Sequence, residues 1–419
     1  MKQPYLRVAA AGVIGNMLEW YDFGLYGLLA PVLASLFFPS TDRTASLLGV
    51  YGGFAIGFAM RPIGAVVLGK LADRVGRRFM LVLSVVLMGA ATVAVGLLPT
   101  YRTIGIWAPV MLMMIRMFQG FSVGGEFVGS VTYLVEAAPM RRRGIAGSVA
   151  NWGATAGLLL AAGVAAIATH WIGSARLTTW PWRLPFFLGG VLALFAYYIR
   201  QSLPEITDEV PAKNGNDEAP LRQAIQRQPG RLLSTVLFTS GYGIVNYLTM
   251  VFLPTFANEF GHIPEYETLR ANTAAQALAL LIVPFAGWIS DAVFTRRAII
   301  AAAFFGEAAI SWPAFGLAAH GVSGLWLAQL MFAVLLSMVM GTAPAMLAEQ
   351  FRSGYRVSAH AVAFNIGIGI FGGTAPMVAI AIIRATSKPV ASAAYLIFAA
   401  ALSFASVLAL VDRSRIPLS

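Results

Sequence analysis

Apolar segments of about 20 residues recur along almost the whole chain, and they constrain its fold more than any other feature of the sequence. A helix of that length crosses the roughly 30 Å hydrocarbon layer of a bilayer. Charged residues make up only 11% of the chain, against about 25% in soluble domains. The sequence therefore predicts an all-α membrane protein with 12 transmembrane helices. The expected spans are residues 9–37, 45–69, 79–99, 106–138, 144–171, 184–200, 232–257, 268–290, 298–319, 324–348, 358–384 and 390–411.

The charges between these spans predict the orientation of the chain. The net charge is +11, and most lysines and arginines fall in the loops of one side, such as Arg77, Arg141 and Arg296. The other side holds few, among them Arg43. By the positive-inside rule, both termini should lie in the cytoplasm. Topology accounts for the basic balance, so we expect the lipid bilayer and no nucleic acid as a partner. The chain has no cysteine, which excludes disulfides and thiol chemistry.

The chain divides into two halves that contain similar motifs at matching positions. Residues 202–231 are rich in Pro, Asn and charged residues, which is typical of a solvated cytoplasmic linker. They separate a first six-helix bundle (1–201) from a second (232–419). GKLADRVGRR (69–78) follows the second span, and GWISDAVFTRR (287–297) follows the eighth. Such matches favour a duplication, a transporter design with the substrate site between the halves.

Two carboxylates share one face of the first span. At 3.6 residues per turn, Asn16, Glu19, Phe23 and Tyr26 fall within a narrow arc, with Asp22 at its edge. Neighbouring carboxylates in a low-dielectric site rarely both ionise, which suits reversible proton binding. The alternative is that either acid only pairs with an arginine and holds helices together.

Two arginines interrupt other apolar spans. Arg61 lies near mid-depth in the second span, and the fourth span places Arg116, Gln119 and Glu126 on one quarter of its circumference. Guanidinium groups bind carboxylates bidentately and stay charged. Both arginines are candidates to bind a substrate carboxylate, and the alternative is an internal salt bridge with Glu126 or Glu19. The predicted proton-coupling residues are Asp22, Glu19 and Glu126.

Further polar and aromatic residues within the spans could line a central cavity, including Tyr242 and Asn246. Glu307 is a mid-span acid of the second half that could couple to protons or face a polar crevice. The predicted substrate-binding residues are Arg61, Arg116, Gln119, Glu19, Tyr26, Trp20, Asn151, Trp152, Tyr247 and Asn365.

Acids stand among the bases of the cytoplasmic loops at matching places in the two halves. Glu136 and Arg143 follow the fourth span, and Glu349 and Arg356 follow the tenth with the same separation. Clusters of this kind can hold the cytoplasmic ends of two bundles together in one conformation, although ordinary topological charge is the simpler alternative. The predicted gating residues are Asp73, Arg74, Arg77, Arg78, Glu136, Arg143, Asp291, Arg296, Arg297, Glu349 and Arg356.

Three patterns that could indicate catalysis lack the context they need. GFSVG (120–124) and GIGIFG (367–372) match a nucleophile elbow and a dinucleotide fingerprint, but neither follows a strand. The four histidines show no metal-ligand spacing. We expect no enzyme, no metal and no cofactor, and a proton gradient as the energy source.

Several motifs resemble a known family. GKLADRVGRR resembles the loop signature of the major facilitator superfamily, and RMFQG (116–120) resembles its fourth-helix motif. GNMLEWYDFGLYG (15–27), RMFQGFSVGGEFVGS (116–130), EAAPMRRRG (136–144) and WRLPFFLGG (182–190) together resemble the metabolite:H⁺ symporter family. Within that family the resemblance is to proline/betaine, α-ketoglutarate and citrate carriers.

The resemblance implies twelve helices, alternating access and proton-coupled uptake through the bacterial inner membrane. It also implies that Asp73 and the adjacent arginines belong to a conformational latch. We therefore expect a symporter, functional as a monomer, that imports a small carboxylate-bearing metabolite. An exporter or antiporter of small amphipathic compounds and a non-transporting sensor are the alternatives.

Overall fold

The computed structural model describes the backbone of residues 3–75, 77–124, 126–201 and 220–418, and every regular element within these ranges is a helix. The side chains of Asp73, Arg74, Arg77, Arg78 and Glu126 lie outside the described residues. The helices of residues 3–201, called the first half below, are α1 (Gln3–Leu28), α2 (Ala30–Phe37), α3 (Arg43–Ala59), α4 (Arg61–Val75), α5 (Arg77–Leu97), α6 (Tyr101–Ile104), α7 (Trp107–Ser122), α8 (Glu126–Ala137), η1 (Met140–Arg142), α9 (Arg143–Ile172), α10 (Ser174–Leu177), η2 (Pro181–Arg183) and α11 (Leu184–Gln201).

The helices of residues 220–418, called the second half below, include two π-helical segments, η3 and η4. They are α12 (Pro220–Arg227), α13 (Pro229–Tyr247), η3 (Leu248–Phe252), α14 (Leu253–Glu259), α15 (Glu265–Ala292), α16 (Arg296–Ala319), α17 (Val322–Ala348), α18 (Arg356–Phe364), η4 (Asn365–Gly372), α19 (Gly373–Thr386), η5 (Pro389–Ala391) and α20 (Ser392–Ala409).

Long rods built from these helices follow the predicted spans. Within the described residues, nine helices are long and apolar enough to cross a membrane. A tenth candidate is the bent pair of α1 and α2, which meet at 65°. The bend falls beside Pro31 in the first turn of α2, where proline has no N–H to continue the ladder of α1. Two rods remain. One is α5, of which Val82–Leu97 is an apolar but shorter stretch, and the other consists of α7, which carries Arg116, followed by α8.

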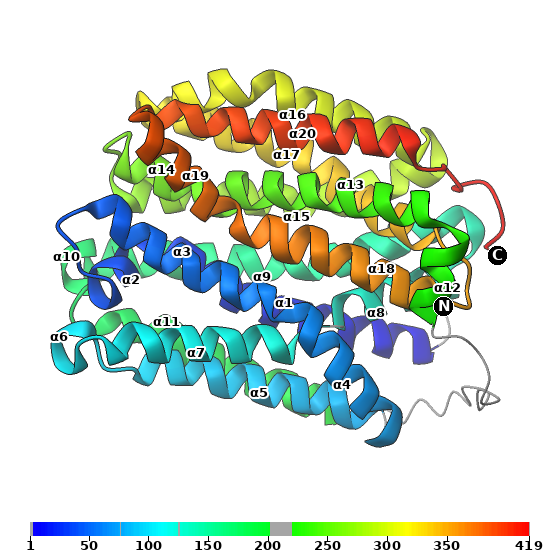
Figure 1. Cartoon of the computed structure of the whole chain (residues 1–419), viewed down its shortest axis with the longest axis horizontal. Helices are drawn as coiled ribbons and strands as arrows, with labels where there is room; N and C mark the ends of the chain where they lie inside the picture. Colours follow the sequence, from blue (N-terminus) through cyan, green and yellow to red (C-terminus); the bar gives the residue numbers. More distant parts are fainter. Residues whose placement is uncertain (1–2, 76, 125, 202–219, 419) are drawn as a thin grey trace.

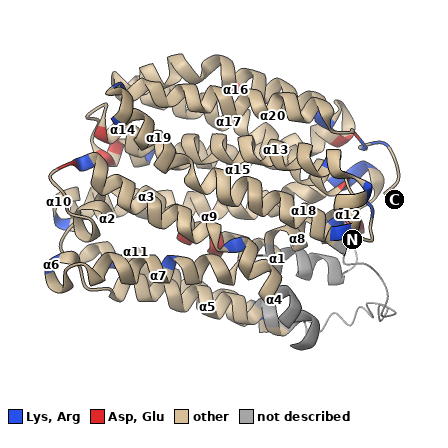
Figure 2. Ribbon diagram, in the orientation of Figure 1, with Lys and Arg blue, Asp and Glu red and all other residues tan. Residues whose placement is uncertain are grey.

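The rods lie side by side, with the first half below and the second half above in the view of Figure 1. Both chain ends lie at the same end of the molecule, here called the termini end, and the other is called the opposite end. Lysine, arginine, aspartate and glutamate gather at these two ends, and only a few interrupt the middle of the rods (Figure 2).

Glycines allow the closest helix contacts. A Cβ on Gly120 of α7 would lie 1.6 Å from the carbonyl oxygen of Gly57 in α3, so only glycine fits this crossing. The crossing brings α7, which carries Arg116, against the end of α3, just before Arg61 at the start of α4. Between the halves, α9 packs along α15, where a Cβ on Gly144 would meet the carbonyl oxygen of Gly287 at 2.5 Å.

Candidate functional site

Glu19 of α1 pairs with Arg61, the first residue of α4. The two side chains approach to 2.7 Å, and each is only 2% exposed. This ion pair is the one polar contact of Glu19 among the described residues, and neither of its carboxylate oxygens receives a well-directed hydrogen bond. The Arg61 guanidinium lies 5.3 Å from the ring centre of Phe58. In this state Arg61 is the cation in contact with Glu19, and the buried Arg200 also attracts its charge.

Asp22 is the centre of a much denser network. One carboxylate oxygen accepts a hydrogen bond from Arg116 at 2.8 Å, and the other accepts from Thr92 at 2.7 Å and Gln119 at 2.8 Å. Gln119 also accepts a hydrogen bond from Arg116 at 2.7 Å, and the Arg116 guanidinium stacks 4.3 Å from the ring centre of Tyr26. A lone threonine in an apolar span gives no sequence signal, so the pattern of residues does not predict a role for Thr92.

A small cavity lies between the two halves. It is lined by three aromatic rings and two amides together with aliphatic groups: Trp20, Asn151, Ala154, Leu158, Tyr242, Asn246, Met340, Phe364 and Ile368. The predicted residues Trp20 and Asn151 are among them. Neither Arg61 nor Arg116 reaches its wall.

Several buried polar groups around this cavity have no hydrogen-bond partner within the described part of the chain. They are Nε1 of Trp20, Oδ1 of Asn246 and the hydroxyl of Tyr247. The Tyr247 ring stacks on Trp20, with ring centres 6.1 Å apart, and it belongs to the other half of the chain. Because buried polar groups are normally paired, these three are available to a bound molecule.

Three sequence-based placements differ from the structure. Trp152 is 38% exposed and does not line the cavity, because it follows Asn151 on α9 and lies about 100° further around the helix. Asn365 donates instead to the carbonyl oxygen of Gly124 at 2.9 Å, and so ties η4 to the first half. The carboxylate of Glu307 is fully buried without a hydrogen-bond partner among the described residues, so these residues form no polar crevice beside it.

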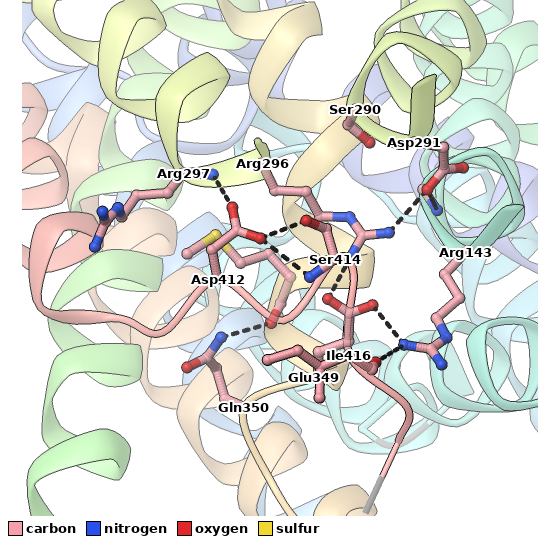
Figure 3. Close-up of polar contacts among 12 residues, drawn as sticks. Arg143, Ser290, Asp291, Arg296, Arg297, Glu349, Gln350, Asp412, Ser414 and Ile416 are labelled. Atoms are coloured by element: carbon pink, nitrogen blue, oxygen red, sulfur yellow. Dashed lines mark hydrogen bonds and ion pairs between the residues drawn. The ribbon is translucent and has the colours of Figure 1, made fainter. Parts of the chain in front are cut away.

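The termini end is closed by ion pairs that cross between the halves. Glu136 of α8 pairs with Arg356 of α18, and Arg143 of α9 lies 3.3 Å from Glu349, just after α17. Arg296 also pairs with Glu349, as Figure 3 shows. The two matching Glu and Arg pairs of the sequence thus exchange partners, each glutamate binding the arginine of the other half.

A helix N-terminus completes this closure, which is called the latch below. Asp291 of α15 accepts hydrogen bonds from the backbone amides of Gly144 and Ile145 at 2.8 and 3.0 Å, in the first turn of α9. A carboxylate is favoured there by the free amides and the helix dipole. Asp291 also bonds Arg296 at 2.9 Å. Arg297 is exposed, and its backbone amide donates to Asp412.

The opposite end is also bridged by ion pairs, which no motif of the sequence predicts. Nε of Arg43 donates to both carboxylate oxygens of Glu259 at 3.0 and 3.1 Å. Arg384 lies 3.0 Å from Asp42, the residue that caps α3. Both pairs join the first half to the second, so this conformation is held closed at both ends.

Comparisons with known proteins place this architecture in a family. Residues 8–208 match the family model described as sugar (and other) transporter. The proline/betaine transporter of Salmonella typhimurium is 31% identical, over 98% of this chain and 84% of its own length. The ectoine/proline transporter of Corynebacterium glutamicum is also 31% identical, over 99% and 85%.

The chain belongs to the metabolite:H⁺ symporter family of the major facilitator superfamily. A crystal structure of a D-xylose–proton symporter shares its fold, with a TM-score of 0.76 at 18% identity and complete coverage of both chains. An inward-open, partially occluded xylose transporter from E. coli gives a TM-score of 0.73 at 17% identity. The family member described here is therefore a membrane transporter with the major facilitator fold.

Proposed function

We propose that this chain is a proton-coupled symporter that imports a small zwitterionic solute bearing a carboxylate, of the proline or betaine type. The observation that carries the proposal is the pair of buried acid–arginine contacts beside a closed cavity between the halves. The relatives named for proline, betaine and ectoine support the substrate class. The distribution of arginines supports a bacterial inner-membrane location with the termini end in the cytoplasm.

Glu19 is the proposed proton-binding residue. Its carboxylate contacts Arg61 and receives no well-directed hydrogen bond among the described residues, whereas the Asp22 carboxylate accepts three hydrogen bonds. A proton on Glu19 removes the counter-ion of Arg61. The freed guanidinium then has an unpartnered Nη1 and a vacant carboxylate site beside the Phe58 ring.

The cavity favours a zwitterion over a di- or tricarboxylate. Its wall offers the rings of Trp20, Tyr242 and Phe364, whose faces attract a cation, and the amides of Asn151 and Asn246. Both nearby arginines already have carboxylate partners. A dicarboxylate would have to displace Glu19 and Asp22 together, while a zwitterion needs at most one arginine.

The two sets of ion pairs between the halves suit alternating access. Opening to the outside breaks the Arg43 and Arg384 contacts and keeps the latch, and opening to the cytoplasm does the reverse. The solute and the proton shift the equilibrium between the outward-open and inward-open states only if they bind these two states with different affinity. With Glu19 protonated, the solute carboxylate takes its place as the partner of Arg61, so that this buried guanidinium keeps a counter-ion when both ends close.

Uptake into proteoliposomes tests this function. Purified protein is given labelled proline, glycine betaine, ectoine, α-ketoglutarate or citrate, with and without an inward proton gradient. We expect gradient-dependent accumulation of a zwitterion that stops when an ionophore collapses the gradient. Accumulation of only a di- or tricarboxylate would overturn the substrate class, and gradient-driven efflux would overturn the direction.

A further inference from the structure

The segment after α20 does not leave the molecule but runs across the termini end (Figure 3). Its first contact is with Gln350, which lies just beyond α17. The Gln350 side chain donates to the carbonyl oxygen of Val411 at 2.9 Å and accepts from the Val411 amide at 3.2 Å. Asp412 then accepts from the backbone amide of Arg297 at 2.9 Å. These contacts fix the segment on the second half.

A local turn redirects the segment. The amide and hydroxyl of Ser414 donate to the same carboxylate oxygen of Asp412, at 3.0 and 2.6 Å. Aspartate commonly forms this kind of turn with the residue two positions on. The amide of Ile416 donates to the carbonyl oxygen of Arg413 at 3.1 Å. Asp412 therefore both attaches the segment to α16 and forms the turn within it.

Beyond the turn, the segment reaches the first half. Nη1 of Arg143 donates to the carbonyl oxygen of Ile416 at 3.0 Å and lies 3.3 Å from Glu349. Leu418 packs partly buried against the main hydrophobic core. One arginine of α9 therefore binds the latch and the segment together.

We propose that residues 410–418 form a strap that stabilises the closed latch. The strap is attached to the second half and contacts Arg143 of the first, so separating the halves at the termini end must break that contact. It biases the transporter against the state open at this end. This inference rests on the alternating access of the proposed function, and its test reads the distance between the halves rather than transport.

Distance measurements between spin labels test the strap. The chain has no cysteine, so labels at Arg141→Cys and Arg227→Cys report the separation of the halves at the termini end without background. Both positions are exposed and outside the latch. Deleting residues 411–419 removes a hydrogen bond from a charged donor, and we expect the open-to-closed ratio to rise about tenfold. Gln350→Ala, which keeps the full chain, should raise it several-fold.

Two controls separate the strap from the latch. Arg415→Ala changes an exposed residue of the same segment and should leave the ratio unchanged. Glu136→Gln breaks a latch pair that does not touch the segment and should raise the ratio. An unchanged ratio after the deletion, with a raised ratio in Glu136→Gln, would overturn the strap while alternating access stands. Unchanged ratios in both would overturn the strap and the latch together.

The coupling to Arg143 is tested by a double-mutant comparison. In an Arg143→Gln background the deletion should change the ratio much less than in the parent chain, because the shared contact is already absent. An equally large effect in both backgrounds would show that the segment acts without Arg143 and would overturn the proposed contact.

Discussion

At the scale of single residues, two acids of α1 that look equivalent in the sequence have different surroundings. The Asp22 carboxylate contacts Thr92, Gln119 and Arg116, whereas the one side-chain contact of the Glu19 carboxylate within the described residues is with Arg61. Removing one partner of a buried ion pair leaves an uncompensated charge, so the two sites should respond differently to neutralisation.

Neutralising Glu19 should uncouple transport from the proton gradient. Glu19→Gln mimics the permanently protonated acid, so we expect solute exchange across the membrane to continue while gradient-driven accumulation falls to the background level. Uptake and counterflow in the same proteoliposomes measure both. Retention of accumulation by Glu19→Gln would rule out this residue as the proton-binding site.

Neutralising Asp22 should instead reduce stability. Asp22→Asn leaves the buried Arg116 without its carboxylate partner, which costs about 3–5 kcal/mol. Thr92→Val removes one hydrogen bond to the same carboxylate and should cost about 1 kcal/mol. Thermal unfolding in detergent should therefore give the highest melting temperature for the parent chain, a lower one for Thr92→Val and the lowest for Asp22→Asn. The reverse order for the two variants would contradict this description of the network.

At the scale of helices and their ends, the contacts of the latch differ in strength. Glu349 is buried between Arg143 and Arg296, while the Glu136 side chain is 42% exposed beside Arg356. Exposed ion pairs contribute at most about 1 kcal/mol, but breaking a buried one is far more costly. The contacts of Glu349 should therefore contribute most of the free energy that stabilises the closed latch.

The latch prediction compares two matched variants. Glu349→Gln leaves two buried guanidinium groups and should shift the ratio of open to closed termini ends by more than tenfold, whereas Glu136→Gln should shift it about fivefold or less. The spin-label pair at residues 141 and 227 measures both. Equal shifts would mean that burial does not set the strength of these contacts.

The strap should release in acid. Burial alone would raise the pKa of Asp412, but hydrogen bonds from the Arg297 amide and Ser414, with the nearby charge of Arg296, hold that pKa below its ordinary value. The docked state thus favours the carboxylate. Its stabilisation is complete above the ordinary aspartate pKa of about 4 and is lost as the pH falls through the lower docked value.

A label in the strap tests this pH dependence. The distance between Ile416→Cys and Ile225→Cys should lengthen as the solution is acidified below about pH 4. Asp412→Asn cannot titrate, so its distance should stay constant over the same range. A parallel change in the asparagine variant would assign the release to another group.

At the scale of the whole molecule, contacts close both ends in one conformation. The latch closes the termini end, while Arg43 with Glu259 and Arg384 with Asp42 close the opposite end. Transport requires that each set breaks in turn. Fixing one end should consequently stop net transport without touching the central cavity.

Covalent bridging of the opposite end tests that requirement. Arg43→Cys with Glu259→Cys places thiols where the native ion pair lies, and a short bifunctional maleimide joins them. We expect net uptake to fall to background in the bridged protein, while each single variant treated alike keeps its activity. Full uptake in the bridged protein would exclude separation of the halves at this end.

Local sequence patterns determined the helices of this protein. Backbone groups in hydrocarbon must bond within their own helix, so a long apolar run specifies a membrane helix wherever it occurs. A charged residue in such an apolar run requires a partner. The sequence therefore identified four candidate site residues, Glu19, Asp22, Arg61 and Arg116. Figure 2 shows how few charges the interior of the bundle holds.

Only the tertiary structure decided which groups meet. The sequence placed Glu136 near Arg143 and Glu349 near Arg356, but the packing of the halves exchanges these partners. The contacts of Thr92 and of the strap could not be predicted either, because hydrogen bonds between distant segments depend on helix rotation and crossing rather than on local sequence pattern. The chain specifies which charges need partners, and the contact between its two halves selects them.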